Sequence, residues 1–175
     1  MSNNLICKIE DKSIKNLSKY NIYFDEKEIE KSNYHQISEN IFHGDEIFSC
    51  NYYKLIELNI THILTVGTMM PPYFEEKFKY KILLLEDSID VNEIETKNLF
   101  DEGFNFIKNC IDKNENILIH CAYGISRSSA MIIYFYMKNY KMKFDDAYKF
   151  IFNKNNLIKP NEKFVEILNN IHYYR

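Results

Sequence analysis

The chain has 175 residues, of which 46% are hydrophobic and 27% charged, and its net charge is −3. This is the size and composition of one globular domain, and the nearly balanced charge gives no reason to expect nucleic acid or an anionic membrane as a general partner. No apolar run reaches the roughly 18 to 20 residues of a membrane span, and the first residues contain no signal-peptide core, so we expect a protein of the cytoplasm or the nucleus.

The beginning of the chain differs in pattern from the rest. Residues 1–37 are polar, rich in Lys, Glu and Asn, and only weakly periodic, with a short helix predicted over 13–20. We interpret 1–37 as an N-terminal extension and 38–175 as the folded domain. Its first elements are predicted to be a short strand, a helix with Ser49 as N-cap, and a β-branched strand: 40–44, 49–59 and 61–67.

The second half of the chain alternates strands and helices. The apolar run 80–86 predicts a strand covered on both faces, and a helical period follows over 93–113. A strand at 116–120 then leads into three helices: 127–140, 144–154 and 160–174, the last opened by Pro160. This alternation predicts a single-domain α/β fold with a mostly parallel sheet of four to five strands and helices on both faces. Ligands of such sheets bind beyond the carboxyl ends of the strands, where Asp87 and Cys121 fall.

The cysteine and histidine patterns do not indicate a metal or a cofactor. The four cysteines form no C-x-x-C pair, and the five histidines form no H-x-x-x-H pair. We therefore expect Cys7, Cys50 and Cys110 to be small buried hydrophobic residues. No metal site and no cofactor are predicted.

A polar turn, "HCAYGISRS", separates the strand at 116–120 from the next helix. A strand-to-helix turn directs backbone N–H groups and the positive end of a helix dipole at one spot, which favours an anion. Arg127 adds a planar fork that fits two phosphate oxygens, and it is the only arginine before the last residue. Gly124 allows the close backbone approach that such a cradle needs. The turn therefore predicts a phosphate site.

Cys121 begins this turn, so the positive field that attracts a phosphate also favours its thiolate. A thiolate beneath a bound phosphate is a nucleophile directed at phosphorus. His120 is expected to support the loop by hydrogen bonding to its backbone. Ser128 can donate a hydrogen bond to the sulfur and stabilise it as a leaving group.

The turn resembles the signature loop of the cysteine-dependent protein phosphatases, in particular their dual-specificity branch. The resemblance covers about residues 37 to 170 and includes "ENIFHGD", "LNITHILTV" and "IKPNEKF". It implies that Cys121 is the nucleophile and Ser128 its partner. The cradle would consist of Cys121, Ala122, Tyr123, Gly124, Ile125, Ser126 and Arg127. The sequence departs from the family pattern at "IFHG", where Tyr-Leu-Gly is commoner, and at Thr65, where asparagine is usual; Tyr123 at the loop rim is also an unusual choice.

The general acid of the family is an aspartate just beyond the strand that precedes the long helix. The stretch "LLLEDSIDVNE" offers Asp87 when counted from the strand and Asp90 when counted back from the helix. We favour Asp87 because the strand end fixes where a side chain enters the site, while a loop beyond it absorbs insertions.

The resemblance implies a phosphoprotein phosphatase that hydrolyses phosphotyrosine and phosphoserine or phosphothreonine through a phosphocysteine. Because Tyr123 at the loop rim can stack on a substrate ring, we expect phosphotyrosine to be hydrolysed faster. The chain contains no Trp, its acid loop "EDSIDVNE" is polar, and only a short extension precedes the first strand, which together indicate a shallow cleft. Two alternatives stay open: a phosphoinositide or RNA 5′-triphosphate phosphatase, and a phosphopeptide-binding pseudophosphatase. The expected partner is a phosphoprotein substrate, with no nucleic acid and no membrane. The chain is expected to be a monomer or a homodimer formed through residues 1–37.

Overall fold

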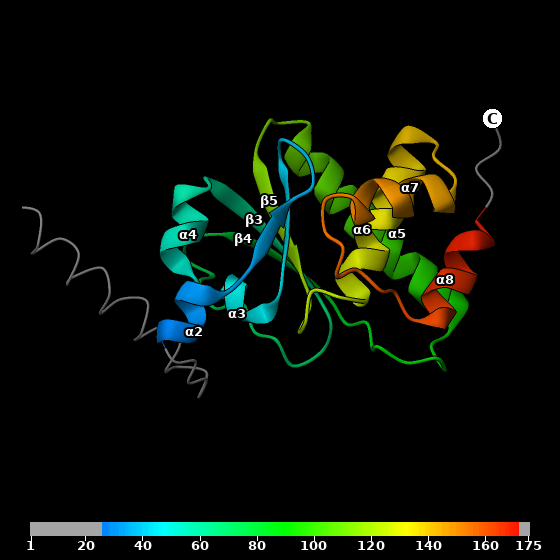
Figure 1. The fold of residues 1–175 in the computed structure, drawn as a ribbon, viewed down its shortest axis with the longest axis horizontal. Coiled ribbons are helices and arrows are strands. Elements are labelled where there is room, and N and C mark those ends of the chain that lie inside the picture. The colour runs from blue at the N-terminus through cyan, green and yellow to red at the C-terminus, as the bar shows by residue number, and fades with distance from the viewer. Residues whose placement is uncertain (1–25, 172–175) are drawn as a thin grey trace, which may run out of the picture.

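The computed structural model describes residues 26–171 (Figure 1). The strands are β1 (Tyr34–Gln36), β2 (Ile41–Gly44), β3 (Ile60–Val66), β4 (Lys79–Leu83) and β5 (Asn116–His120). The helices are α2 (Glu26–Lys31), α3 (Glu46–Ser49), α4 (Tyr52–Glu57), α5 (Glu93–Ile111), α6 (Arg127–Tyr140), α7 (Phe144–Phe152) and α8 (Glu162–Asn169). None of these helices is long and apolar enough to cross a membrane. The helix predicted over 13–20 lies outside the described residues.

The five strands form one sheet in the order β1-β2-β5-β3-β4. All neighbours are parallel except β1 and β2, which are antiparallel. This confirms the predicted α/β fold with a mostly parallel sheet. Because β5 lies between β2 and β3, the loop that leaves its carboxyl end is flanked by the ends of two other strands.

Two apolar layers cover the sheet, and the alternation of side chains along the strands explains them. Leu64 and Val66 of β3 pack into the larger core, which includes side chains of α5, α6, α7 and α8. Ile63 points to the other face and packs into a smaller core with Phe48 of α3 and Leu55 of α4. The prediction of helices on both faces is therefore confirmed.

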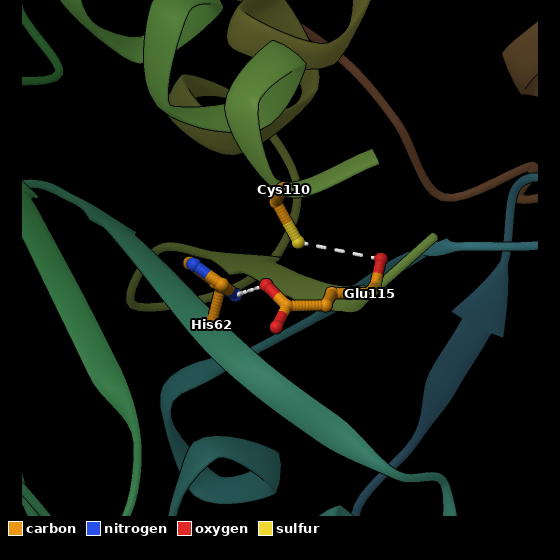
Figure 2. A group of neighbouring side chains, drawn as sticks. All are labelled: His62, Cys110 and Glu115. Carbon is orange, nitrogen blue, oxygen red and sulfur yellow. Dashed lines mark hydrogen bonds and ion pairs between the residues drawn. The ribbon is translucent and has the colours of Figure 1, made fainter. Parts of the chain in front are cut away.

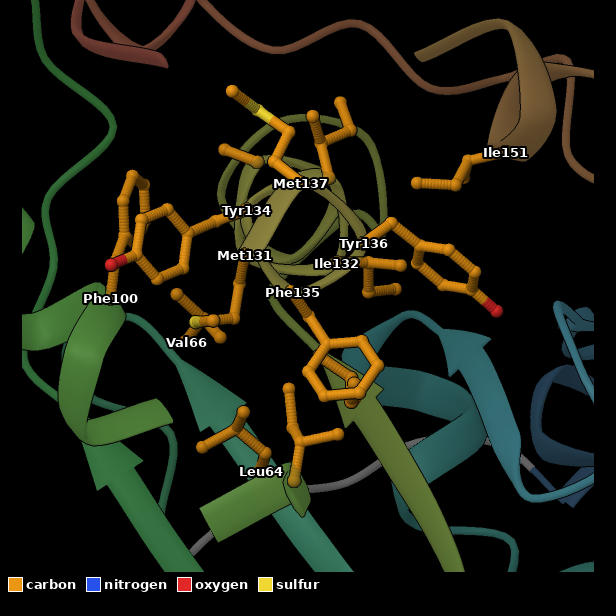
Figure 3. Packing of buried hydrophobic residues seen from close by; sticks show 14 of the residues in the cluster. Leu64, Val66, Phe100, Met131, Ile132, Tyr134, Phe135, Tyr136, Met137 and Ile151 are labelled. Atoms are coloured by element: carbon orange, nitrogen blue, oxygen red, sulfur yellow. The ribbon is translucent and has the colours of Figure 1, made fainter. Parts of the chain in front are cut away.

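Helix α6 runs through the middle of the larger core. Figure 3 shows its side chains directed to several sides, with Phe135 and Met131 toward the sheet and Phe100 of α5 beside Tyr134. A helix that is apolar nearly all round is a buried one, and α6 is buried continuously from Ser128 to Met137. The packing of α6 in the larger core consequently holds its first turn in place. This turn contains Arg127.

Several local predictions were wrong in detail. In place of one helix over 49–59, the structure has two short helices, one that begins earlier and one inside this range. Asp45 caps α3 by accepting from Phe48 N, and Asn51 caps α4 by accepting from Lys54 N. Ser49, the expected N-cap, ends α3 instead. Each of these caps satisfies N–H groups that a helix start leaves without partners.

The strand predicted over 80–86 is shorter and lies at the sheet edge. β4 pairs only with β3, its first residues are partly exposed, and Leu84 beyond its end is 69% exposed. An apolar run indicates burial without telling which neighbours provide it. At the opposite edge, β1 pairs with β2, and Ile37 belongs to the core, so residues that we assigned to the extension form part of the sheet.

Candidate active site

A loop at the carboxyl end of β5 forms a cradle at the start of α6. β5 ends at His120, Cys121 follows with 1% exposure, and α6 begins at Arg127. Ser126 is the N-cap of α6, but its side chain makes no capping hydrogen bond. The first N–H groups of this 14-residue helix therefore face the loop without a side-chain partner, which is the arrangement that binds an anion.

The shape of the cradle depends on Gly124. Its φ angle is +64°, and a Cβ at this position would lie 2.8 Å from the carbonyl oxygen of Gly44 at the end of β2. Only glycine fits both conditions. Backbone bonds secure the loop on two sides: Glu46 N–H donates to the carbonyl of Ala122 at 3.2 Å, and Lys159 N–H donates to that of Ile125 at 2.8 Å.

The Arg127 guanidinium is directed to the end of β3. A Cβ on Gly67 would lie 2.6 Å from Arg127 Nη1, so the glycine makes room for the fork. The Arg127 side chain is 11% exposed, and its Nε lies 3.8 Å from Asp87 Oδ2. This Nε is buried and has no hydrogen-bond partner among the described residues. A buried guanidinium with an unused donor is suited to a bound oxyanion.

The Cys121 sulfur accepts a hydrogen bond from Ser128 Oγ at 3.1 Å. Ser128 lies in the first turn of α6 and is fully buried. The structure therefore brings together the three groups that the sequence placed in this turn: the thiol, the serine and the arginine.

The structure also separates the two candidate acids. Asp87 lines a cavity of about 530 Å³ together with Cys121 and Arg127. Asp90 lines a different cavity, with Leu84 and Thr96. Asp87 Oδ1 accepts hydrogen bonds from Ser126 Oγ and from Asn161 Nδ2, both at 2.7 Å. The strand-based count thus agrees with the position of Asp87, whose role as an acid stays a prediction.

The rim of the cavity is largely apolar. Tyr123 is 78% exposed, Ile89 66% and Ile125 40%, and all three line the cavity. Lys159 and Glu162 add one charge of each sign. An apolar rim around a basic floor accommodates a phosphorylated side chain better than a polyanion.

His120 is buried below the cradle. Its Nε2 lies 2.9 Å from the hydroxyl of Thr65, and Nδ1 is buried without a hydrogen-bond partner of good geometry among the described residues. We expected a bond to the loop backbone. Burial lowers the pKa of the His120 ring, and an interaction with the backbone of Cys121 at the start of the loop opposes this effect by raising the pKa. The side-chain partner is on β3, at the position where the family pattern usually has asparagine.

Two buried histidines make stability depend on pH. Burial lowers the pKa of His43 to about 3 and that of His120 to about 4, from an ordinary value of 6.5. Below pH 6.5 the unfolded chain binds protons that the folded chain excludes, so the free energy of unfolding decreases as the pH falls through this window. We expect a loss of about 2 kcal/mol per histidine between roughly pH 7.5 and pH 5, measured by urea unfolding. In His43→Leu the part of this pH-dependent loss of unfolding free energy that His43 causes should be absent. An identical pH dependence of stability in both proteins would contradict this.

A second group of reactive side chains lies at the opposite end of the sheet. Figure 2 shows His62, Cys110 and Glu115, whose ligand atoms lie within 4.8 Å of one another. They come from β3, from the last turn of α5 and from the residue before β5. Nitrogen, sulfur and carboxylate ligands of this kind occur in zinc sites.

Hydrogen bonds within the protein satisfy most of this group. Thr61 Oγ1 donates to the carbonyl of Asn116 at 3.2 Å and therefore accepts from His62 Nδ1 at 2.8 Å. Cys110 donates its thiol hydrogen to the carbonyl of Glu115 at 3.3 Å, and burial raises the pKa of this thiol to about 12. His62 Nδ1 and Cys110 Sγ thus each carry a hydrogen that is donated to another group of the protein. The absence of a metal site stays a prediction from the sequence.

Sequence reasoning missed three residues that the structure places around the nucleophile, Asn161, His43 and Asn155, and it assigned Ser126 to the cradle without its contact to Asp87. Ser126 and Asn161 hold Asp87, and Asn161 also caps α8 by accepting from Phe164 N. His43 and Asn155 continue the hydrogen bonding beyond Ser128. The motif "IKPNEKF" already marked Asn161 as a helix start, but nothing local indicated its second contact.

Comparisons with known proteins agree with this geometry. The family model "Dual specificity phosphatase, catalytic domain" matches residues 47–173. Dual specificity protein phosphatase 1B of Arabidopsis thaliana is 30% identical over 133 residues, which are 76% of this chain and 78% of that protein. Human dual specificity protein phosphatase 9 is 31% identical over 132 residues, which are 74% of this chain but only 34% of that protein. The crystal structure of human tyrosine phosphatase-like serine/threonine/tyrosine-interacting protein superposes with a TM-score of 0.71 at 27% identity and covers 77% of this chain and 92% of that one.

Proposed function

Because this chain belongs to the dual specificity phosphatase family, we propose that it hydrolyses phosphotyrosine and phosphoserine or phosphothreonine in proteins through a phosphocysteine at Cys121. One observation carries the proposal: Cys121, Arg127 and the carboxylate of Asp87 line one cavity, and the buried Ser128 donates to the Cys121 sulfur. Nothing in the assignment requires a cofactor.

In the first step the Cys121 thiolate attacks phosphorus while the phosphate oxygens lie on the N–H groups of the cradle and on Arg127. A sulfur–phosphorus bond forms and the bond to the leaving oxygen breaks. That oxygen needs a proton, which Asp87 gives. Asp87 Oδ1 is occupied by Ser126 and Asn161, so Oδ2 is the oxygen from which the proton leaves.

In the second step Asp87, now a carboxylate, takes a proton from water, and the water oxygen attacks phosphorus. The sulfur–phosphorus bond breaks, and Cys121 leaves as a thiolate. Ser128 stabilises this developing negative charge through its hydrogen bond to the sulfur. Inorganic phosphate is released, and Asp87 again holds the proton that it gives in the next turnover.

The apolar rim supports action on protein side chains. Tyr123 and Ile125 offer surfaces for the substrate residue, and an exposed aromatic ring can stack on phosphotyrosine. A phosphoinositide or an RNA 5′-triphosphate carries several negative charges, whereas Glu162 offsets Lys159 beside the site. The lining therefore favours a singly phosphorylated side chain.

A matched set of peptides tests this specificity. The peptides carry phosphotyrosine, phosphothreonine or phosphoserine in one sequence context, and phosphate release is measured for each. We expect turnover of all three, with phosphotyrosine fastest because its ring reaches Tyr123. Tyr123→Ala should reduce this advantage and leave the phosphothreonine rate nearly unchanged.

Three results would refute the assignment. Phosphotyrosine turnover with no detectable phosphothreonine or phosphoserine release would exclude a shallow cleft. Faster release from a phosphoinositide or RNA 5′-triphosphate than from every peptide would favour the first alternative. Binding of phosphopeptides without any turnover would favour a pseudophosphatase.

A further inference from the structure

Four buried polar side chains form a line that ends at the nucleophile. Asn155 Nδ2 lies 3.0 Å from His43 Nδ1, and His43 Nε2 lies 2.8 Å from Ser128 Oγ. Ser128 Oγ lies 3.1 Å from the Cys121 sulfur. None of the four is more than 3% exposed. They come from the loop after α7, from β2, from α6 and from the cradle, so the line joins parts of the chain that are distant in sequence.

A backbone group fixes the orientation of the first member. The N–H of Leu157 donates to Asn155 Oδ1 at 3.0 Å. The oxygen of the amide is therefore directed to Leu157, and its nitrogen is directed to His43. An amide nitrogen has hydrogens to give but no lone pair to accept one. Consequently His43 Nδ1 acts as the acceptor and carries no hydrogen.

The tautomer of His43 follows from this contact. The ring is fully buried, and burial lowers its pKa to about 3, so it is neutral near pH 7. A neutral imidazole has one ring hydrogen. With Nδ1 as acceptor, the hydrogen is on Nε2, which donates it to Ser128 Oγ.

The Ser128 hydroxyl oxygen accepts from His43, and its single hydrogen is free to be donated. The Cys121 sulfur accepts this hydrogen. A serine in a helix has a competing choice, the carbonyl four residues earlier. The neighbouring Ser129 makes that choice and donates to the carbonyl of Ile125 at 2.8 Å. The two adjacent serines of α6 thus differ in the direction of their hydroxyl hydrogens, and only Ser128 contacts an imidazole.

We propose that His43 and Asn155 are positioning residues that hold the Ser128 hydroxyl with its hydrogen on the Cys121 sulfur and thereby accelerate hydrolysis of the phosphocysteine. The proposal rests on the phosphocysteine mechanism given above. Each bond in the line polarises the next, which strengthens the final contact to a sulfur that becomes negative as it leaves.

The kinetic test uses His43→Leu and Asn155→Leu at pH 7 with an aryl phosphate whose leaving group departs easily. Formation of the phosphocysteine is then fast, and its hydrolysis limits turnover. We expect kcat to fall by about fivefold. KM should fall with it, so that kcat/KM changes by less than about twofold. Rapid-quench measurements should show a larger burst, because phosphocysteine accumulates.

His62→Leu is the matched control. His62 is also a buried histidine on a strand, 2% exposed, but it lies outside the line. It should lower Tm without changing the ratio of kcat to KM or the burst. An unchanged kcat in His43→Leu, or a fall in kcat/KM without accumulation of phosphocysteine, would overturn the proposal.

A spectroscopic test does not depend on turnover. The ring nitrogens of His43 in the wild-type protein, observed by ¹⁵N NMR, should report a neutral Nε2–H tautomer between pH 5 and pH 8. Asn155→Leu should produce a mixture of tautomers. An Nδ1–H tautomer or an imidazolium in the wild-type protein would refute the hydrogen-bond direction. If instead the wild-type protein released no phosphate from any substrate, the proposed function would fail while the tautomer result stood.

Discussion

Cys121→Ser is expected to abolish turnover of an aryl phosphate while binding of phosphate or vanadate survives. The serine hydroxyl is a weak nucleophile at its ordinary pKa, so the rate should fall by at least about 10⁴-fold. The cradle is built from backbone N–H groups and Arg127, and these remain. Steady-state assays give the first result, and isothermal titration with the oxyanion gives the second.

Cys110→Ser is the appropriate control. Cys110 is buried like Cys121 but lies at the other end of the sheet, where it donates to the carbonyl of Glu115. A serine can keep this bond, so activity should be close to that of the wild type. Turnover by Cys121→Ser near the wild-type level would exclude the phosphocysteine mechanism.

Arg127→Lys separates the shape of the cation from its charge. Gly67 leaves space for a planar guanidinium, and a lysine ammonium cannot form the same two-pronged contact. We expect Arg127→Lys to lower both the oxyanion affinity and kcat. Cys121→Ser, in contrast, should lower kcat and keep the oxyanion affinity.

Asp87→Asn is expected to lower the rate by roughly 100-fold for a substrate with a poor leaving group. The loss should be much smaller for a leaving group that departs without a proton. An asparagine keeps the oxygen that accepts from Ser126 and Asn161, so the loop geometry is preserved and the missing proton is the main change. A series of aryl phosphates of increasing leaving-group pKa measures the effect.

Asp90→Asn is the matched control, because Asp90 is an aspartate of the same loop that lines a separate cavity. It should show no dependence on the leaving group. If Asp90→Asn shows the leaving-group pattern and Asp87→Asn does not, the assignment of the acid is reversed.

The parts of the site that were predictable are local in sequence. Cys121, Gly124 and Arg127 lie within one turn, and a strand before it and a helix after it already specify a backbone that binds an anion. Asp87 was predictable because a strand end determines where the next side chain enters. Fold class followed from the alternation of strands and helices, which repeats along the chain.

The parts that were not predictable depend on distant contacts. His43 and Asn155 are 112 residues apart in the sequence and meet only because β2 pairs with β5 beneath the cradle. The edge position of β4 depends on strand order, which a single apolar run does not encode. The break between α3 and α4 depends on two competing caps, Asp45 and Asn51, that surround the expected one.

The two bonds that hold Asp87 determine how the site responds to a ligand. Ser126 belongs to the cradle and Asn161 to the start of α8, so the carboxylate is fastened to the same rigid frame as the nucleophile. In an enzyme whose general acid enters the site on a moving loop, only the closed form binds substrate fully. The apparent affinity for substrate is then reduced in proportion to the fraction of molecules in the closed form. Because Ser126 and Asn161 both bind Asp87, we expect this fraction to be near one in this chain. The site is therefore preformed before the ligand binds. Oxyanions of tetrahedral or trigonal-bipyramidal shape should associate in a single kinetic phase.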